Sequence, residues 1–521
     1  MRKSIKHRFA ISFIASLIRS GITLGTAVLL ARWLGPTDYG RMAFLLSTFT
    51  AVRGVLDMGA SSAFFTLISR RHRTRKFFMI FWGFIAIQLA LALMLLMILL
   101  PDSMVSALWA GESRGMLVLA FLAAFMQGTV WTLASQMAEA SRQTIRVQKI
   151  NLIAVIFHLI AIIVLALMGK LAINIIFFML IAEWAVAAWL LSRVYVFLDN
   201  HHSTNCAEIE TPKSVLMEFY VYCAPLMPAL LLGFVLEFAD KWMLQTWGGA
   251  NEQAYFSIGQ QFSAIALLAT ASVMNILWKE VSEAHHQQDI TRVKMLYQRA
   301  SRLLFFVGAF LAGGLQPLAS DILRMSVGQA YIDASLAMAI LFFYPVHQSI
   351  GQINGMLMLA TGKTKEYSII SIFTMIFSLL VLYIMLAPAS MPIPGLDLGA
   401  LGLAIKQVGV QFLAVNIFSL IISRIFGWKF DWLYQLLLIL VCLLLGWISY
   451  YIAFGLWIES GFLTVRFAFM ATLYVVLVGF FIYLFPWVLT TTKFELISAL
   501  RKFVASFSKV IGLILKYKVS S

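Results

Sequence analysis

Apolar positions divide this chain into long, nearly continuous hydrophobic segments, which short polar turns separate. Most segments reach the ~20 residues that cross a bilayer as an α-helix. They lack the alternation over ~10 residues that is typical of a membrane β-barrel. The pattern predicts an all-α polytopic membrane protein with about 14 transmembrane helices. The expected spans are 9–31, 41–68, 77–100, 116–138, 147–169, 171–192, 219–247, 254–278, 301–319, 335–360, 367–388, 399–423, 432–455 and 462–489.

Composition supports the membrane assignment, because 61% of the 521 residues are hydrophobic and only 12% are charged. A soluble chain of this size would need a more polar surface. The first segment is too long for the apolar region of a signal peptide, so we expect it to be a span. Cys206, Cys223 and Cys442 have no metal-binding spacing, and neither do His201-His202 and His285-His286, so we expect no metal site.

The basic residues predict the orientation of the spans. With the N-terminus inside, 29 of the 39 Lys and Arg residues lie in inside segments and five lie in outside loops. Such a bias places both termini in the cytoplasm. It also accounts for the net charge of +16 as a topology signal and an attraction to anionic membrane lipids. We therefore expect no nucleic-acid partner.

A polar cytoplasmic segment after the sixth span divides the chain into two halves. The expected organisation is an N-terminal six-helix half at 1–198, a linker at 199–218, a C-terminal six-helix half at 219–424, an extra helix pair at 425–490 and a basic tail at 491–521. In the tail, apolar residues recur every three or four positions, as in an amphipathic helix. We expect this helix to lie on the cytoplasmic leaflet, with a partner-binding helix as the alternative.

The two halves carry a weak internal repeat. A constant offset of 214 residues aligns Trp33 with Trp247, Gly35 with Gly249 and Gly40 with Ala254. Both turns follow an inside-to-outside helix at the start of a half. Halves in the same orientation predict a parallel repeat, with a pseudo-twofold axis along the membrane normal and a central cavity between them.

Ionisable residues inside the spans are candidate functional residues, because each costs at least ~2.5–3.5 kcal/mol at the bilayer centre. Arg53 and Asp57 are four residues apart on one helix, as are Glu237 and Lys241, so each pair is expected to neutralise itself. The others need water or a partner on another helix: Arg19, His158, Glu183, His347 and Lys406. Asp240 lies three residues from Glu237. Polar neutral residues in the spans include Gln348, Asn354 and Gln411, which suggests a hydrated cavity.

The first turn reads ARWLGPTDYGRMA from Ala31 to Ala43. It resembles the ARxLGPxxYGxxA signature of the polysaccharide transporter family, the Wzx-type flippases of the multidrug/oligosaccharidyl-lipid/polysaccharide exporter superfamily. The stretch FADKWML from Phe238 to Leu244 is similar to the family's ADRxxL pattern, with Lys241 where arginine is commoner. Ala254 departs from the glycine that is usual in the second turn.

This resemblance implies a non-enzymatic flippase in the bacterial cytoplasmic (inner) membrane. Its substrate would be an undecaprenyl-diphosphate-linked oligosaccharide for cell-surface polysaccharide such as O-antigen, exopolysaccharide or capsule. Polymerase and chain-length proteins of the same pathway would be partners. Guanidinium and ammonium groups suit a diphosphate, which makes Arg19, Arg53, Lys241 and Lys406 the candidate diphosphate ligands.

Further roles follow for other polar residues. Trp131, Trp184, His347, Gln348, Asn354 and Gln411 are candidates for sugar or cavity contacts. Glu183, Glu237, Asp240 and Asp57 are candidates for binding a coupling Na⁺ or proton, because a partly buried carboxylate can do either. No other cofactor is expected. The first competing function is a cation-coupled multidrug exporter of the same superfamily. The second is a polysaccharide polymerase or ligase, which the short outside loops disfavour.

Overall fold

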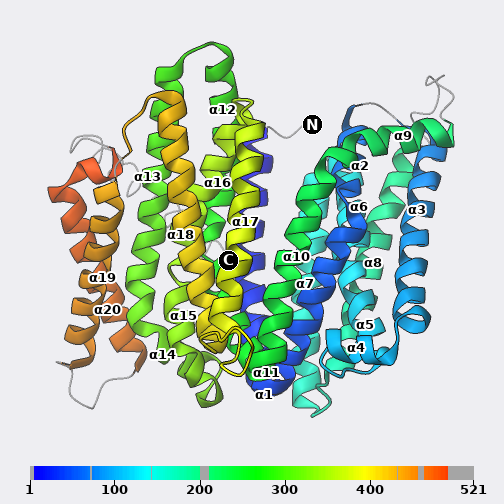
Figure 1. Cartoon of the computed structure of the whole chain (residues 1–521), viewed down its shortest axis with the longest axis horizontal. Helices are drawn as coiled ribbons and strands as arrows, with labels where there is room; N and C mark the ends of the chain where they lie inside the picture. Colours follow the sequence, from blue (N-terminus) through cyan, green and yellow to red (C-terminus); the bar gives the residue numbers. More distant parts are fainter. Residues whose placement is uncertain are drawn as a thin grey trace, which may run out of the picture. The chain divides into compact units, whose positions relative to one another are not determined.

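The computed structural model describes residues 5–70, 73–141, 143–199, 211–430, 432–455 and 463–490. Every regular element in these residues is helical, as the apolar pattern predicts (Figure 1). Twelve helices of the described residues are long and apolar enough to cross a membrane. The chain is therefore a multi-pass membrane protein. The predicted tail helix at 491–521 and most of the predicted linker lie outside the described residues.

Chain contacts group the helices into two compact units. Unit 1 comprises 1–265, 320–341 and 368–410, and unit 2 comprises 266–319, 342–367 and 411–521. Unit 1 contains α1 (Ile5–Asp57), α2 (Ala60–Arg70), α3 (Arg75–Met94), α4 (Asp102–Leu108), α5 (Arg114–Phe125), α6 (Trp131–Ala140), α7 (Thr144–Leu167), α8 (Ile173–Asp199), α9 (Pro212–Cys223), α10 (Met227–Met243), α11 (Gly249–Ala264) and α15 (Ser335–Leu341).

Unit 2 contains α12 (Leu267–His286), α13 (Ile290–Leu315), α16 (Tyr344–Ala360), α19 (Trp432–Gly455) and α20 (Leu463–Leu484). Three helices contribute residues to both units: α14 (Ala319–Ser326), α17 (Thr364–Leu386) and α18 (Gly399–Phe426). Inside unit 2, α12 and α13 form a hairpin, and α13 packs against α16 and α19. Helix α9 begins at Pro212 with a capping box from Thr211, inside the segment expected to be a linker.

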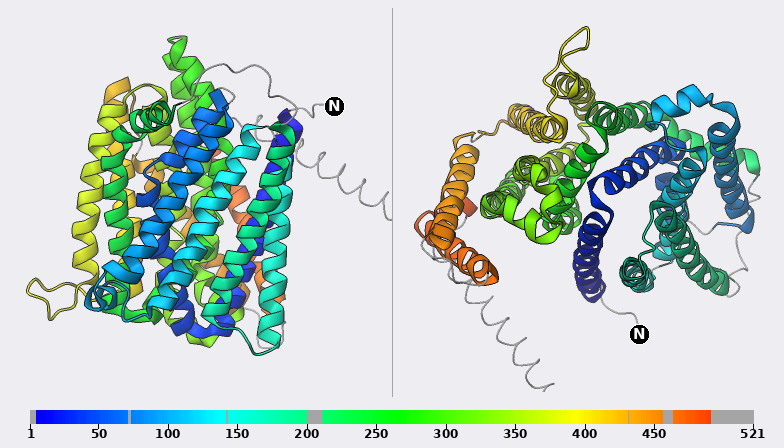
Figure 2. Two further views of the ribbon diagram at one scale, coloured as in Figure 1. Left: turned by 90° about the vertical axis from the view of Figure 1, so that its right-hand side faces the viewer. Right: turned by 90° about the horizontal axis from the view of Figure 1, so that it is seen from below.

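The difference between twelve helices and the fourteen expected spans lies at two glycines. The continuous helix α1 is broken at Gly35, which has φ 75° and ψ 172°, and the chain reverses there (Figures 1 and 2). The helical stretch 212–264 is broken in the same way at Gly249, which has φ 83° and ψ −177°. A positive φ of this kind favours glycine, which has no Cβ. The count of fourteen stays a prediction.

The broken helices confirm the internal repeat. Gly35 and Gly249, which the offset of 214 aligns, share one unusual backbone conformation. The aligned residues Thr37 and Asn251 also meet, with Thr37 Oγ1 lying 3.0 Å from Asn251 Oδ1. Contact between equivalent residues is what a twofold axis produces, because both copies present the same surface to each other. Helices α1 and α11 accordingly pack along each other in unit 1.

Gly40 permits this close packing and gives a first prediction. A Cβ at Gly40 would collide with the backbone carbonyl of Ala250 on α11. We expect Gly40→Val to separate the two helices and lower the stability of the purified protein by several kcal/mol, as for other overpacked or strained core changes. Thermal unfolding in detergent measures this effect. Gly54→Ala is the control, because nothing lies within 4 Å of a Cβ there; an equal loss of stability would contradict the prediction.

Candidate functional site

Helix α10 carries the motif charges into unit 1, and one of them pairs with a distant helix. Lys406 Nζ on α18 donates to Asp240, at 2.6 Å from Oδ1 and 2.9 Å from Oδ2. The Lys406 side chain is 5% exposed and that of Asp240 is 24% exposed. A buried ammonium needs such a carboxylate, because an unpaired charge in a low-dielectric environment is very costly. The two residues are 166 positions apart, and no sequence spacing indicates their contact.

The expected pair between Glu237 and Lys241 does not form. Lys241 Nζ instead lies 4.3 Å from the centre of the Phe256 ring on α11. Lys241 prefers the Phe256 ring because that contact is the more stabilising one. An ion pair between residues four apart on a helix stabilises it by ~0.2–0.5 kcal/mol, whereas a desolvated cation–π contact stabilises by ~2 kcal/mol. Glu237 is exposed and makes no hydrogen bond or ion pair with the residues that the structure describes. The N–H groups of the Lys241 ammonium are therefore not used in an ion pair with Glu237 and can bind another acceptor.

The expected pair between Arg53 and Asp57 is also absent from the described part of the chain. Arg53 Nη1 donates to the backbone carbonyl of Gly128, at 2.8 Å, while its buried Nε has no hydrogen-bond partner. Asp57 accepts from the backbone N–H of Ser61, at 3.1 Å, and from its hydroxyl. Asp57 therefore serves the first turn of α2 as a carboxylate cap. Arg53 and Asp57 therefore each hydrogen-bond a neutral group and not each other.

Gly128 is a functional candidate that the sequence reasoning missed. It lies in the π-helical segment η2 (Met126–Val130), which joins α5 to α6. A side chain at this position would collide with the Arg53 guanidinium, so the glycine leaves room for it. Single π-turns inside helices are frequent at functional sites. The available signal was the polar run Gln127-Gly128-Thr129 inside an apolar span.

Glu183 has the partner on another helix that its sequence context required. Its carboxylate lies 2.8 Å from Nδ1 of His158 on α7, and both side chains are largely buried. Trp184 follows Glu183 directly in the sequence, and its ring centre lies 5.2 Å from that of Trp131. Both tryptophans belong to a buried cluster of α6, α7 and α8, where they pack against apolar side chains. In this arrangement they serve the core of unit 1.

The remaining candidates are divided between the two units. Arg19 is in unit 1 and donates to Ser16 on its own helix, at 3.3 Å. His347, Gln348, Asn354 and Gln411 belong to unit 2. His347 is buried edge-on between the rings of Phe305 and Phe412. It occupies an aromatic packing position within that unit.

Asn354 connects three helices of unit 2 and gives a second prediction. It accepts from the Tyr297 hydroxyl, at 2.8 Å, and donates to Ser419 Oγ, at 2.9 Å, and to the Val415 carbonyl, at 3.2 Å. We expect Asn354→Leu to destabilise the protein by about 2–4 kcal/mol, because it leaves buried polar groups without a hydrogen-bond partner. Thermal unfolding tests this, with the half-buried Gln348→Leu on the same helix as control. Unchanged stability of Asn354→Leu would refute the structural role.

Unit 1 also contains a pocket with apolar and aromatic walls, formed by α1, α3, α5, α10 and the segments between α3 and α5. Its empty volume is about 1320 Å³. Phe49, Val52 and Leu56 line it from α1, and Phe234 and Phe238 line it from α10. These helices also carry Arg53 and Lys241. The unit therefore combines cations with an apolar recess, which suits a ligand that has an anionic and an apolar part.

Comparisons with known proteins agree with the fold. The model of a family described as polysaccharide biosynthesis protein matches residues 29–336. The lipid II flippase MurJ in an inward closed conformation matches with TM-score 0.66 and 14% identity, over 91% of this chain and 99% of MurJ. An inward-facing multidrug resistance MATE transporter of the MOP superfamily matches with TM-score 0.60 and 13% identity, over 81% and 99% of the two chains.

A third solved structure is a MOP superfamily transporter from Pyrococcus furiosus, whose binding pocket is described as having reverse polarity. It matches with TM-score 0.55 and 13% identity, over 82% of this chain and 97% of that transporter. No curated protein matches the chain by sequence. At these identities the structural matches establish the fold alone.

Proposed function

Because the chain belongs to the polysaccharide biosynthesis protein family and has the fold of MOP-superfamily flippases and transporters, we propose that it flips a lipid-linked oligosaccharide. The substrate is a repeat unit on undecaprenyl diphosphate, moved from the cytoplasmic to the outer leaflet of the bacterial inner membrane. Alternating access around a central cavity provides the route. The product supplies a surface polysaccharide, and polymerase and chain-length proteins are the expected partners.

The observation that carries this proposal is the position of the Lys241 ammonium, which has no ion-pair partner among the described residues. It rests on the Phe256 ring and is hydrogen-bonded to no described carboxylate, so its donors can turn to an incoming anion. Arg53 likewise uses one guanidinium nitrogen on Gly128 and keeps an unpartnered Nε. A diphosphate is an anion that both guanidinium and ammonium groups bind strongly. The apolar pocket of unit 1 suits part of the polyprenyl chain.

Coupling to an ion gradient involves the acidic residues. Glu183 is paired with His158, Asp57 with Ser61 and Asp240 with Lys406, whereas Glu237 has no partner among the described residues. We assign Glu237 as the first candidate for binding Na⁺ or a proton, since its exposed carboxylate accepts no hydrogen bond from the described residues and is available to either. Arg19 remains a candidate diphosphate ligand on α1.

The test is genetic and biochemical. Deletion of the gene is expected to deplete surface polysaccharide and to accumulate the lipid-linked intermediate in the inner leaflet. Lys241→Ala is expected to reproduce both effects with the protein still present in the membrane. Normal polysaccharide together with lost drug resistance would instead establish a multidrug exporter and overturn the proposal.

A further inference from the structure

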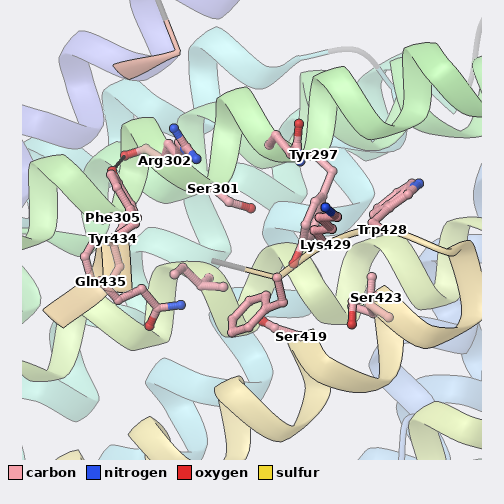
Figure 3. Close-up of a pocket in the computed structure, with 14 residues that line it drawn as sticks. Tyr297, Ser301, Arg302, Phe305, Ser419, Ser423, Trp428, Lys429, Tyr434 and Gln435 are labelled. Atoms are coloured by element: carbon pink, nitrogen blue, oxygen red, sulfur yellow. Dashed lines mark hydrogen bonds between the residues drawn. The ribbon is translucent and has the colours of Figure 1, made fainter. Parts of the chain in front are cut away.

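Unit 2 contains a second pocket that the transport proposal does not use (Figure 3). It lies where α13, α16, the end of α18 and the start of α19 meet, and its empty volume is about 620 Å³. Figure 3 shows Arg302, Tyr434 and Gln435 on one side and Lys429, Trp428 and Ser423 on the other.

The pocket lies at the membrane interface. Residues 427–430 lie in the turn between the spans Gly399–Phe426 and Trp432–Gly455, and this turn contributes Trp428, Lys429 and Phe430 to the lining. Tryptophan and tyrosine concentrate at the level of lipid headgroups, because their rings are apolar and their edges are polar. A ligand reaching this pocket would therefore come most directly from the surrounding lipid.

The charge of the lining is positive. Arg302 and Lys429 line the pocket, and none of its fourteen described lining residues is a carboxylate. The Arg302 guanidinium lies 4.7 Å from the centre of the Tyr434 ring and donates to the Trp487 carbonyl, at 2.9 Å, which fixes its position. Lys429 is exposed and has no described acidic partner. Such a lining favours an anion.

Polar groups and aromatic walls define the rest of the ligand. The buried Ser301 hydroxyl lines the pocket beside Tyr297. Trp428 stacks on Phe426, with ring centres 4.8 Å apart, and Phe305 packs on Tyr434, at 5.8 Å. Hydroxyl donors beside apolar walls suit a phosphate that is attached to glycerol and the first carbons of acyl chains. A free phosphate would leave those walls unused.

We propose that this pocket binds the headgroup of an anionic phospholipid of the phosphatidylglycerol type, as a bound lipid that is not transported. Basic pockets between membrane helices are known to hold such headgroups. The phosphate is attracted by Lys429 and Arg302, and the glycerol lies toward Ser301. The lipid thereby joins α13 and α18 to α19, the first helix of the extra pair.

The experiment uses the purified full-length protein in detergent and short-chain phosphatidylglycerol as the probe. Native mass spectrometry counts bound lipid, and thermal unfolding measures stabilisation. Phosphatidylcholine, inorganic phosphate and glycerol phosphate are tested at the same concentrations. The variant is Lys429→Gln, an exposed position whose change leaves the core intact. The matched control is Lys363→Gln, a lysine in another short turn between spans that does not line the pocket.

We expect phosphatidylglycerol to bind and to raise the unfolding temperature of the wild-type protein and of Lys363→Gln. Lys429→Gln should bind it about fivefold more weakly, the loss of one lysine contact at a membrane surface. Equal binding by both variants, or equal stabilisation by phosphatidylcholine, would overturn the proposal. Equal stabilisation by inorganic phosphate would overturn the assignment to a lipid, and displacement by undecaprenyl diphosphate would assign the pocket to transport instead. None of these readouts depends on flipping, so the proposed function is tested separately.

Discussion

Asp240→Asn is expected to destabilise the protein more than any other single change in the candidate site, by about 3–5 kcal/mol. The substitution leaves the Lys406 ammonium, with its side chain 5% exposed, without the carboxylate that lies 2.6 Å from it. Lys406→Met should cost less, because the Asp240 side chain is 24% exposed and can be hydrated in part. Thermal unfolding in detergent gives both values. Glu237→Gln on the same helix is the stability control, since Glu237 has no described partner.

The double variant Asp240→Asn/Lys406→Met separates stability from transport. Replacing both members of a buried pair with neutral groups is often neutral for stability, so its unfolding temperature should return toward that of the wild type. Flipping by the double variant should nevertheless be lost, because Lys406 is one of the four candidate diphosphate ligands. The lipid-linked intermediate in cells measures this. Restored polysaccharide synthesis in the double variant would show that Lys406 only neutralises the charge of Asp240 and does not bind the diphosphate.

Arg53→Ala is expected to reduce flipping by at least about 100-fold. A guanidinium that binds a phosphate in bidentate fashion makes two charge-assisted hydrogen bonds, each worth about 1.5–3 kcal/mol, and every 1.4 kcal/mol corresponds to tenfold. Arg53→Lys keeps the charge without the planar fork and should recover only part of the rate. Transport of lipid-linked substrate by equal amounts of membrane-inserted protein is the measurement.

Gly128→Val tests the position of the Arg53 guanidinium by changing the residue that it contacts. The added side chain would collide with the Arg53 guanidinium and displace it, while the charge itself remains. We expect a loss of flipping that approaches that of Arg53→Ala. Gly115→Val, at an exposed position of α5 where a Cβ meets nothing within 4 Å, is the control. Full transport by Gly128→Val would show that the position of Arg53 does not matter.

Local signals in the sequence were sufficient for the architecture. Long apolar runs predicted the helices, because a chain in lipid must satisfy its backbone hydrogen bonds internally. The glycines at 35 and 249 marked the reversals, and their shared backbone conformation confirms the repeat that three aligned residues suggested. The turn and α10 motifs indicated the family that the match over 29–336 shows. Each of these features depends on a few neighbouring residues.

What the sequence by itself determined is therefore which residues enter the membrane and which of them carry charge. Only the tertiary structure decided which charges meet. Spacing within one helix favoured Glu237 with Lys241 and Arg53 with Asp57, but those contacts are weak. Asp240 pairs instead with Lys406, Lys241 with the Phe256 ring and Arg53 with the Gly128 carbonyl. Contacts between helices prevail because low-dielectric surroundings strengthen electrostatic interactions and penalise an unpaired group, and only the packing of distant segments creates those surroundings.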